Sequence, residues 1–271
     1  MSNILERIVE TKRAEVAAAK LRRPMGELSA AVRDAGPVRN LFDAVIAKPN
    51  RRVGLIAEIK KKSPSAGLIR PDFDPVRLAQ TYHAHGADAL SVLTDEVYFD
   101  GSLDFIAGVR QAVPLPVLRK DFMIDAYQVY EARAAGADAV LLIGEVLEPD
   151  LLAELLALSH ELGMTTLVEV HEAETLAAVL SVIPFPNDKR GLLGINNRNL
   201  KIQRTDLATT AELAQRAPAN TPIVAESGIS SAADVAQLTK AGARALLIGE
   251  TFMRAGDVGA KVNEVMGPLP A

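Results

Sequence analysis

The sequence predicts an α/β protein that folds as a closed (β/α)8 TIM barrel with an N-terminal helical extension. The first observation is a repeated pattern, in which a helix that ends in glycine precedes a short apolar segment. It occurs at residues 84–90, 134–140 and 240–246. Glycine suits the residue after a helix because it adopts left-handed backbone angles without strain. The repeats are spaced by multiples of roughly 50 residues, as βα units of about 25 residues would be.

The second observation is that apolar segments of strand length alternate with amphipathic segments of helix length, such as Pro75–His85 and Asp150–Leu162. Short apolar runs are typical of buried parallel strands. The eight predicted strands are Val53–Lys60, Ala89–Leu93, Val117–Arg119, Ala139–Ile143, Thr166–Val170, Leu192–Ile195, Ile223–Ala225 and Ala245–Ile248. Eight alternating units favour a closed barrel over an open doubly wound sheet. The nucleotide signatures common in open sheets, Gly-x-Gly-x-x-Gly and Gly-x-x-x-x-Gly-Lys, are absent.

The first 50 or so residues precede the first predicted strand and carry helical patterns. A first helix is predicted from apolar residues with helical spacing, namely Ile4, Leu5, Ile8, Val9 and Val16. A second helix is predicted over Leu41–Ala47, before Pro49. This segment is too short for a core of its own. We therefore expect a single domain over residues 1–271, with residues 1–50 packed on the barrel.

The composition excludes several classes of function. The chain has 271 residues, 49% of them hydrophobic and 24% charged, and a formal net charge of −4. Without a basic excess, a nucleic-acid partner is not expected, although a local phosphate site is compatible with this charge. The absence of cysteine excludes disulfides, thiolate metal sites and cysteine nucleophiles. Because no signal-peptide core and no apolar run of membrane-spanning length is visible, we expect a cytoplasmic enzyme without a membrane partner.

Charged residues at the carboxyl ends of the predicted strands are the candidates for chemistry, because barrel active sites lie at that end. Glu58 and Lys60 are two residues apart in the first strand and therefore share a face. If that face points into the lumen, the Glu58 carboxyl group and the Lys60 amine lie together at the mouth of the barrel. The alternative is a structural ion pair. The basic loop at residues 61–67 can fold over an anionic ligand.

The third and fifth strands supply another amine and another carboxylate. Adjacent residues point to opposite faces, so only one of Arg119 and Lys120 can enter the lumen, and we expect Lys120. Glu169 closes an apolar run and would face these amines, in surroundings that tune proton affinity. The alternatives are a surface charge for Lys120 and a salt bridge to a neighbouring strand for Glu169.

The ends of the last three strands suggest substrate contacts. Asn196 can orient a hydroxyl, and Arg198 can hold a carboxylate, unless this segment is an ordinary asparagine-rich turn. Glycine-containing loops after the seventh and eighth strands form the usual phosphate site of such barrels. The candidates there are Ser227, Gly228 and Gly249. The four histidines show no metal-ligand spacing, and His171, near the mouth, either contacts substrate or binds nothing.

These segments together resemble the indole-3-glycerol phosphate synthase family. The resemblance runs in order from the N-terminal helix to Gly249. It is carried by Ala57–Ser65 (AEIKKKSPS), Tyr98–Ser102 (YFDGS), Leu118–Phe122 (LRKDF), Leu167–Val170 (LVEV), Gly194–Leu200 (GINNRNL) and Ala225–Ile229 (AESGI). Related barrels that act on similar phosphosugars lack the Glu-x-Lys-x-x-Ser-Pro-Ser segment, so the combination is specific.

The resemblance implies an enzyme of tryptophan biosynthesis that needs no cofactor and no metal. Its substrate would be a small phosphorylated molecule, 1-(2-carboxyphenylamino)-1-deoxyribulose 5-phosphate, converted to indole-3-glycerol phosphate by ring closure, decarboxylation and dehydration. The implied catalytic residues are Lys120, Glu169, Lys60, Glu58, Asn196 and Glu226. The implied substrate-binding residues are Ser63, Phe99, Phe122, Arg198, Ser227, Gly228, Gly249 and Glu250.

Within this set, Lys120 is implied as the acid at the keto oxygen and Glu169 as the base, while Lys60 or Lys120 supplies the second acid. Glu250 stands where family members often carry serine, and a carboxylate there would repel a phosphate. We therefore expect its side chain to turn away and only its backbone amide to contribute. Three other functions remain open: a phosphoribosylanthranilate isomerase, a Schiff-base aldolase and a non-catalytic phosphosugar-binding protein.

Overall fold

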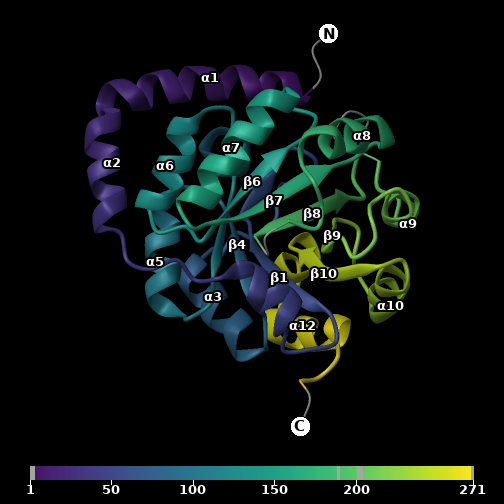
Figure 1. The fold of residues 1–271 in the computed structure, drawn as a ribbon. Helices are drawn as coiled ribbons and strands as arrows, with labels where there is room; N and C mark the ends of the chain where they lie inside the picture. The colour runs from purple at the N-terminus through teal and green to yellow at the C-terminus, as the bar shows by residue number, and fades with distance from the viewer. Residues whose placement is uncertain (1–3, 188–189, 200–203, 270–271) are drawn as a thin grey trace.

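The computed structural model describes residues 4–187, 190–199 and 204–269. Within these residues, eight parallel strands close into a barrel (Figure 1). Their order around the barrel is β1 (Gly54–Ile59), β10 (Ala243–Ile248), β9 (Ile223–Glu226), β8 (Gly191–Asn196), β7 (Thr165–Val170), β6 (Ala139–Ile143), β5 (Val117–Lys120) and β4 (Ala89–Leu93). Each strand begins and ends within about two residues of its predicted range. The pairing of Gly54 with Ala245 closes the sheet, so the closed barrel is confirmed and the open sheet is excluded.

Helices follow the strands and surround the barrel (Figure 1). The longer ones are α3 (Pro75–Ala84), α5 (Asp104–Ala112), α6 (Ala126–Ala134), α7 (Pro149–Glu161), α8 (Ala173–Val182), α9 (Ala208–Ala214), α10 (Ala232–Lys240) and α12 (Val258–Met266), and the shorter ones are α4 (Glu96–Phe99) and α11 (Glu250–Met253). Local sequence sets their ends. Asp74 accepts hydrogen bonds from the Val76 and Arg77 amides at the start of α3. Gly86 follows α3 with φ of 72°, as predicted.

The alternation of side chains along each strand separates two apolar layers. Leu55, Ala57 and Ile59 of β1 belong to the layer between the strands and the surrounding helices. Ile56 belongs instead to the layer that fills the lumen, together with Leu118 of β5, Leu167 of β7 and Val224 of β9. Residues two positions further along each strand share the inward direction. This parity directs a set of polar residues into the carboxyl end of the barrel: Glu58, Lys60, Lys120, Glu169 and Glu226.

The N-terminal segment contacts both ends of the barrel. It contains α1 (Ile4–Arg22), α2 (Met25–Asp34) and η1 (Asp43–Ala47), a π-helix within the second predicted helix. At the amino end, the carbonyl of Val45 lies so close to Gly54 that a Cβ there would collide with it. At the carboxyl end, α1 places Ile4, Leu5 and Ile8 against the central pocket. Figure 1 shows α1 along one edge of the molecule and α2 beside α6.

Two elements differ from the predictions. Helix α2 was not predicted, although Leu28, Ala31 and Val32 have helical spacing, and Leu28 is its one buried residue. The basic loop folds as a hairpin of β2 (Lys62–Ser63) and β3 (Gly67–Leu68). Lys61 and Lys62 lie 3.4 and 3.2 Å from the carboxylate oxygens of Asp100, so they pair with the segment after α4 rather than remain free in solvent.

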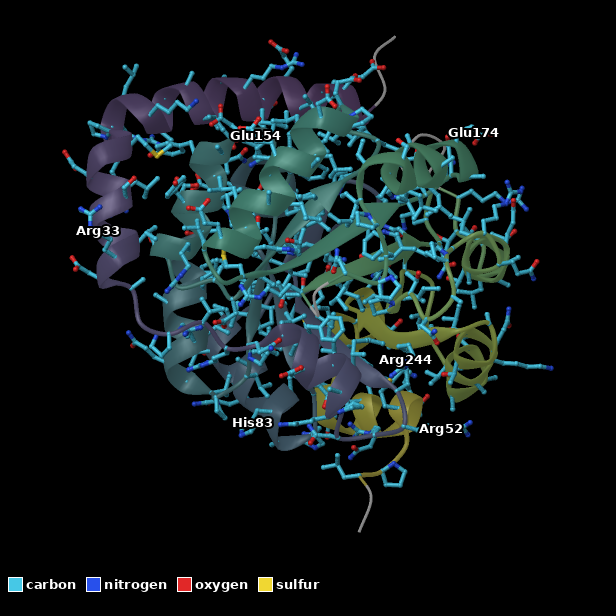
Figure 2. All side chains as sticks on the ribbon, viewed as in Figure 1. Arg33, Arg52, His83, Glu154, Glu174 and Arg244 are labelled. Atoms are coloured by element: carbon cyan, nitrogen blue, oxygen red, sulfur yellow. The ribbon has the colours of Figure 1, made fainter. Side chains whose placement is uncertain are left out.

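Charged side chains cover the outer surface. Figure 2 shows Arg33, Arg52, Glu154, Glu174 and Arg244 pointing outward from five different segments, and each of these residues is exposed. Among the described residues, no helix has the length and apolar composition that crossing a lipid bilayer requires.

Candidate active site

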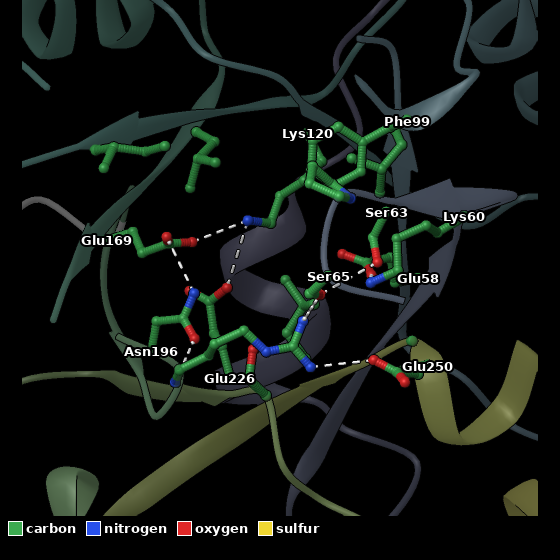
Figure 3. Close-up of a pocket in the computed structure, with 18 of the residues that line it drawn as sticks. Glu58, Lys60, Ser63, Ser65, Phe99, Lys120, Glu169, Asn196, Glu226 and Glu250 are labelled. Carbon is green, nitrogen blue, oxygen red and sulfur yellow. Dashed lines mark hydrogen bonds and ion pairs between the residues drawn. The ribbon is translucent and has the colours of Figure 1, made fainter. Parts of the chain in front are cut away.

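A single pocket at the carboxyl end of the barrel contains every predicted site residue. The structure places in its lining the predicted catalytic residues Glu58, Lys60, Lys120, Glu169, Asn196 and Glu226. It also places there the predicted substrate-binding residues Ser63, Phe99, Phe122, Arg198, Ser227, Gly228, Gly249 and Glu250. Figure 3 shows the labelled members of this set, among them Lys120, Glu169 and Glu226, pointing into the pocket from separate strands. Leu200, the last residue of the Gly194–Leu200 segment, lies outside the described residues. The placement is observed, whereas the individual roles remain predictions.

The Lys120 ammonium lies at the centre of the charged part of the pocket. Its Nζ donates to Glu169 Oε2 at 2.9 Å and lies 3.7 Å from Glu226 Oε2 (Figure 3). Asn196 Nδ2 donates to the other Glu169 oxygen at 3.1 Å. Arg119 points the opposite way and donates to Glu131 at 2.8 Å. The prediction that Lys120, and not Arg119, enters the lumen is therefore confirmed.

Burial and pairing together decide which of these groups is charged. Burial alone would lower the pKa of Lys120, but nearby carboxylates, led by that of Glu169, raise that pKa above its usual value. Burial would raise the pKa of Glu169, but Lys120 and then His171 hold it well below its usual range. For Glu226, burial and the Glu169 charge both raise the pKa well above its usual value. The arrangement therefore favours the charged forms of Lys120 and Glu169 and the protonated form of Glu226.

Glu58 and Lys60 form a second buried pair in the same pocket. The Lys60 ammonium donates to Glu58 Oε1, and the two residues are 8% and 5% exposed, respectively. Both sequence interpretations thus apply, because the ion pair exists and it faces the lumen. The neighbouring Gly249 has an ordinary φ, and its small size matters instead, since a Cβ there would collide with the Glu58 carboxylate.

Backbone and hydroxyl groups line another part of the pocket rim. Ser227 and Gly228 follow β9 with left-handed φ values of 64° and 77°, a conformation that turns the chain sharply at the mouth. Ser63 is buried, and its hydroxyl oxygen accepts a hydrogen bond from the Ala66 backbone amide at 3.2 Å. Turns rich in glycine and serine at this position of a barrel are suited to bind a phosphate. The predicted anion site is thus assembled from the β2–β3 hairpin and the loops after β9 and β10.

Glu250 departs from the expectation for its side chain. It does not turn away from the rim, because its carboxylate accepts from Arg198 at 3.0 Å and from Arg254 at 2.9 Å. Burial alone would raise the pKa of Glu250, but these two guanidinium groups lower it. Arg198 also donates to Ser65 at 3.3 Å. The two arginines neutralise the carboxylate, which allows it to remain beside an anion site.

An apolar wall completes the pocket. The rings of Phe99 and Phe122 lie with centroids 6.1 Å apart at an interplanar angle of 38°. Ile4, Leu5 and Ile8 of α1 extend this wall. Sequence reasoning assigned these three residues to packing and not to the site, because helical spacing alone does not reveal what an apolar face covers.

Two further side chains behind Glu169 were not among the predicted site residues. His171 Nε2 lies 3.3 Å from Glu169 Oε1, and its Nδ1 lies 2.8 Å from Glu145 Oε2. His171 is not among the described residues that line the pocket, and it lies beside Glu169 instead. Its position two residues after Glu169 was a usable signal, since residues at that spacing share a face. No sequence signal identified Glu145.

The residues that the structure describes contain no group of three or more His, Asp or Glu side chains arranged to hold a metal ion. The barrel and its pocket define the class of protein: a TIM-barrel enzyme in which an ammonium–carboxylate cluster shares one pocket with a rim suited to an anion.

Comparison with known proteins identifies the family within that class. The chain matches the family described as indole-3-glycerol phosphate synthase over residues 5–265. It is 51% identical over 268 residues to an indole-3-glycerol phosphate synthase of Rhodospirillum rubrum, covering 98% of this chain and 100% of that protein. With the enzyme of the same name from Azospirillum brasilense, it is 47% identical over 267 residues, covering 98% and 100%. The chain belongs to the indole-3-glycerol phosphate synthase family.

Solved structures with lower sequence identity show the same fold. A 3-hexulose-6-phosphate synthase aligns with a TM-score of 0.61 at 18% identity, covering 79% of this chain and 98% of that one. An N-acetylmannosamine-6-phosphate 2-epimerase from Clostridium perfringens aligns with a TM-score of 0.59 at 13% identity, covering 80% and 92%. These similarities support the barrel architecture alone.

Proposed function

We propose that this pocket converts 1-(2-carboxyphenylamino)-1-deoxyribulose 5-phosphate to indole-3-glycerol phosphate, CO2 and water, a carboxy-lyase step of tryptophan biosynthesis. The observation that carries the proposal is the buried Lys120–Glu169 pair, which lies in one pocket with an apolar wall and an anion-binding rim. The three parts of the pocket correspond to the keto group, the aromatic ring and the phosphate of this substrate. The family to which the chain belongs supports the same reaction.

Substrate binding follows from the lining of the pocket. The carboxyphenyl ring lies against Phe99 and Phe122, and the phosphate binds at the turns of Ser227, Gly228 and Gly249. Arg198 and Lys60 neutralise the substrate carboxylate or phosphate. Ser63 adds a hydroxyl to the rim. Residues 1–50 and the barrel work as a single domain in this proposal, because α1 supplies part of the wall that holds the ring.

Ring closure forms a bond between the aromatic carbon that bears the carboxylate and the keto carbon of the sugar. The keto oxygen gains negative charge as this bond forms. The Lys120 ammonium stabilises that charge and donates the proton that turns the oxygen into a hydroxyl. The closed ring carries a positive iminium. This iminium takes up the electron pair of the bond between the ring carbon and the carboxylate carbon, and CO2 leaves.

Loss of CO2 restores the benzene ring, and dehydration then completes the indole. An acid protonates the departing hydroxyl, and either Lys60 or Lys120 fits this step. Glu169, ionised and fixed by Asn196, removes a proton from the ring CH2 next to the nitrogen, so that the nitrogen keeps its own hydrogen. Glu226 Oε1 is buried without a hydrogen-bond partner in the described residues. A substrate hydroxyl would satisfy it, so Glu226 and Asn196 hold the sugar chain, and Glu58 keeps Lys60 in place.

The raised pKa of Lys120 argues against the aldolase alternative. A Schiff base requires a neutral amine, whereas the neighbouring carboxylates keep this amine protonated. Borohydride trapping with a keto-phosphate tests this directly, and we expect no covalent adduct at Lys120.

The test of the proposed function is a fluorescence assay with the purified chain. Adding 1-(2-carboxyphenylamino)-1-deoxyribulose 5-phosphate should produce indole fluorescence. One molecule of CO2 should be released for each molecule of indole-3-glycerol phosphate formed. The chain contains no tryptophan that would mask the signal. Isomerisation of phosphoribosylanthranilate, or binding of the substrate without turnover, would contradict the proposal.

A further inference from the structure

A buried histidine and its carboxylate partner lie behind the proposed base. His171 directly follows β7 and is 7% exposed. The carboxylate of Glu145, which follows β6, accepts hydrogen bonds from the backbone amide of His171 and from its ring Nδ1, each at 2.8 Å. Because one carboxylate accepts both hydrogen bonds, the position and the rotation of the imidazole are fixed. The remaining ring nitrogen, Nε2, lies 3.3 Å from Glu169 Oε1.

Glu169 therefore lies between two cationic groups. Lys120 is 2.9 Å from its Oε2 on the pocket side, and His171 is near its Oε1 on the side away from the pocket. Burial alone would lower the pKa of His171, but the carboxylates of Glu145 and Glu169 raise it to about 10. The imidazole is then charged at neutral pH.

The two cations have different fates during the proposed reaction. Lys120 donates a proton to the substrate, and its hold on Glu169 weakens when it does. Burial would then favour the protonated form of Glu169, and the site would lose its base. His171 is held by Glu145 and is not among the described residues that line the pocket, so its charge remains beside Glu169 throughout the cycle.

We propose that His171 is a positioning residue for this reaction: its imidazolium, fixed by Glu145 behind β7, keeps Glu169 ionised while Lys120 acts on the substrate. The inference rests on the proposed function, in which Glu169 is the base. The other groups that bear on Glu169 are Lys120 from β5, Asn196 from β8 and the carboxyl of Glu226 from β9. All of these lie on the pocket side.

The test is the pH dependence of kcat/KM in His171→Gln. Removing a cation next to a carboxylate raises the pKa of that carboxylate by about 1–3 units. The acid limb of the profile should therefore move to higher pH by about that amount, and the loss of activity should shrink as the pH rises. A purely structural defect would lower activity by the same factor at every pH. His171→Lys, which keeps a positive charge, should restore the acid limb towards its original position.

Matched controls and a direct measurement make the result decisive. His83→Gln changes an exposed histidine of α3 and should leave the profile unchanged. Ring nitrogen NMR of the unliganded protein should show His171 protonated at pH 8 and losing its proton near pH 10, and Glu145→Gln should lower that value. A neutral His171 at pH 7, or an unshifted acid limb in a folded His171→Gln protein, overturns the inference. Because the NMR arm needs no substrate, an inactive wild type would contradict the proposed function alone.

Discussion

Arg119 and Lys120 are neighbours on β5, yet they belong to two clusters of buried charge that do different work. The outer cluster comprises Arg119, Asp121, Asp95 and Lys12, and it lies between the barrel and α1. Lys12 lies 2.8 Å from Asp95 and 3.0 Å from Asp121, and Arg119 lies 3.1 Å from Asp121. The inner cluster comprises Lys120, Glu169, Glu226 and His171. It faces the pocket on one side and Glu145 on the other.

The difference lies in how completely the charges are compensated. Asp121 accepts from Lys12, Arg119, Thr94 and the Phe122 amide. In the inner cluster, burial and the Glu169 charge raise the pKa of Glu226 well above its usual value, and one Glu226 oxygen has no hydrogen-bond partner among the described residues. The fully paired Asp121 and its ion pair with Lys12 hold α1 beside the mouth. The incompletely paired Glu226 lines the pocket, where a ligand can reach it. Alternation along one strand therefore separates support from chemistry.

The largest expected effect comes from the inner cluster. Lys120→Ala and Glu169→Gln should each lower kcat by about 10²–10⁴-fold, as loss of a positioned acid or base does. Indole fluorescence under saturating substrate measures this. Lys240→Ala, at an exposed position of α10, is the control and should retain full turnover. Turnover close to that of the wild type in either inner variant would refute the assigned roles.

The outer cluster should respond in stability instead. Asp121→Asn removes the buried carboxylate that Lys12 and Arg119 share, leaving each cation with one carboxylate fewer, and should lower the free energy of unfolding by about 3 kcal/mol. Urea denaturation measures the change. Glu10→Gln, which alters an exposed pair with Arg13, should change it by less than about 0.5 kcal/mol. If Asp121→Asn loses turnover as severely as Lys120→Ala while remaining equally stable, the separation between the clusters fails.

The same carboxylate predicts a pH effect with a definite sign. Burial alone would raise the pKa of Asp121, but Arg119 and Lys12 lower it from 3.8 to about 2. The native state therefore binds this proton less readily than the unfolded chain does. The ionised Asp121 carboxylate contributes about 2 kcal/mol to the free energy of unfolding above about pH 4. This contribution is lost as the pH falls towards 2. The stability gap between wild type and Asp121→Asn should narrow over that range, and a constant gap would contradict this account.

The smallest expected effect concerns the rim of the pocket. Glu250 is paired with Arg198, so under the proposed binding mode it competes with the substrate for the Arg198 guanidinium. Glu250→Ser should lower KM by about 2–5-fold with little change in kcat, as expected for a partly exposed ion pair worth about 1 kcal/mol or less. Glu264→Ser, which removes a surface pair with Lys261, serves as the control. A raised KM would show instead that Glu250 orients Arg198 for binding.

Much of the site was predictable because its signals are local. Strand parity allowed only one of Lys120 and Arg119 to face inward, the position of Lys120 nearer the loop favoured it, and parity also predicted a shared face for Glu58 and Lys60. The same rule would have found His171, had it been applied beyond Glu169. The partners of these groups were not predictable in the same way. Glu145 reaches His171 only because β6 and β7 are adjacent, and Arg198 and Arg254 converge on Glu250 from separate segments.

By itself, the sequence determined the alternation of strands and helices, the closure of the barrel, the residues that face its lumen and the resemblance to one family. These follow from periods of two and 3.6 residues and from glycines at helix ends, which act over a few positions of the chain. The tertiary structure decided which cation faces which carboxylate, which groups are charged, and how α1 covers the pocket. Those properties depend on distances of a few ångströms between segments far apart in the chain, because pairing and burial set pKa values only once the barrel has closed.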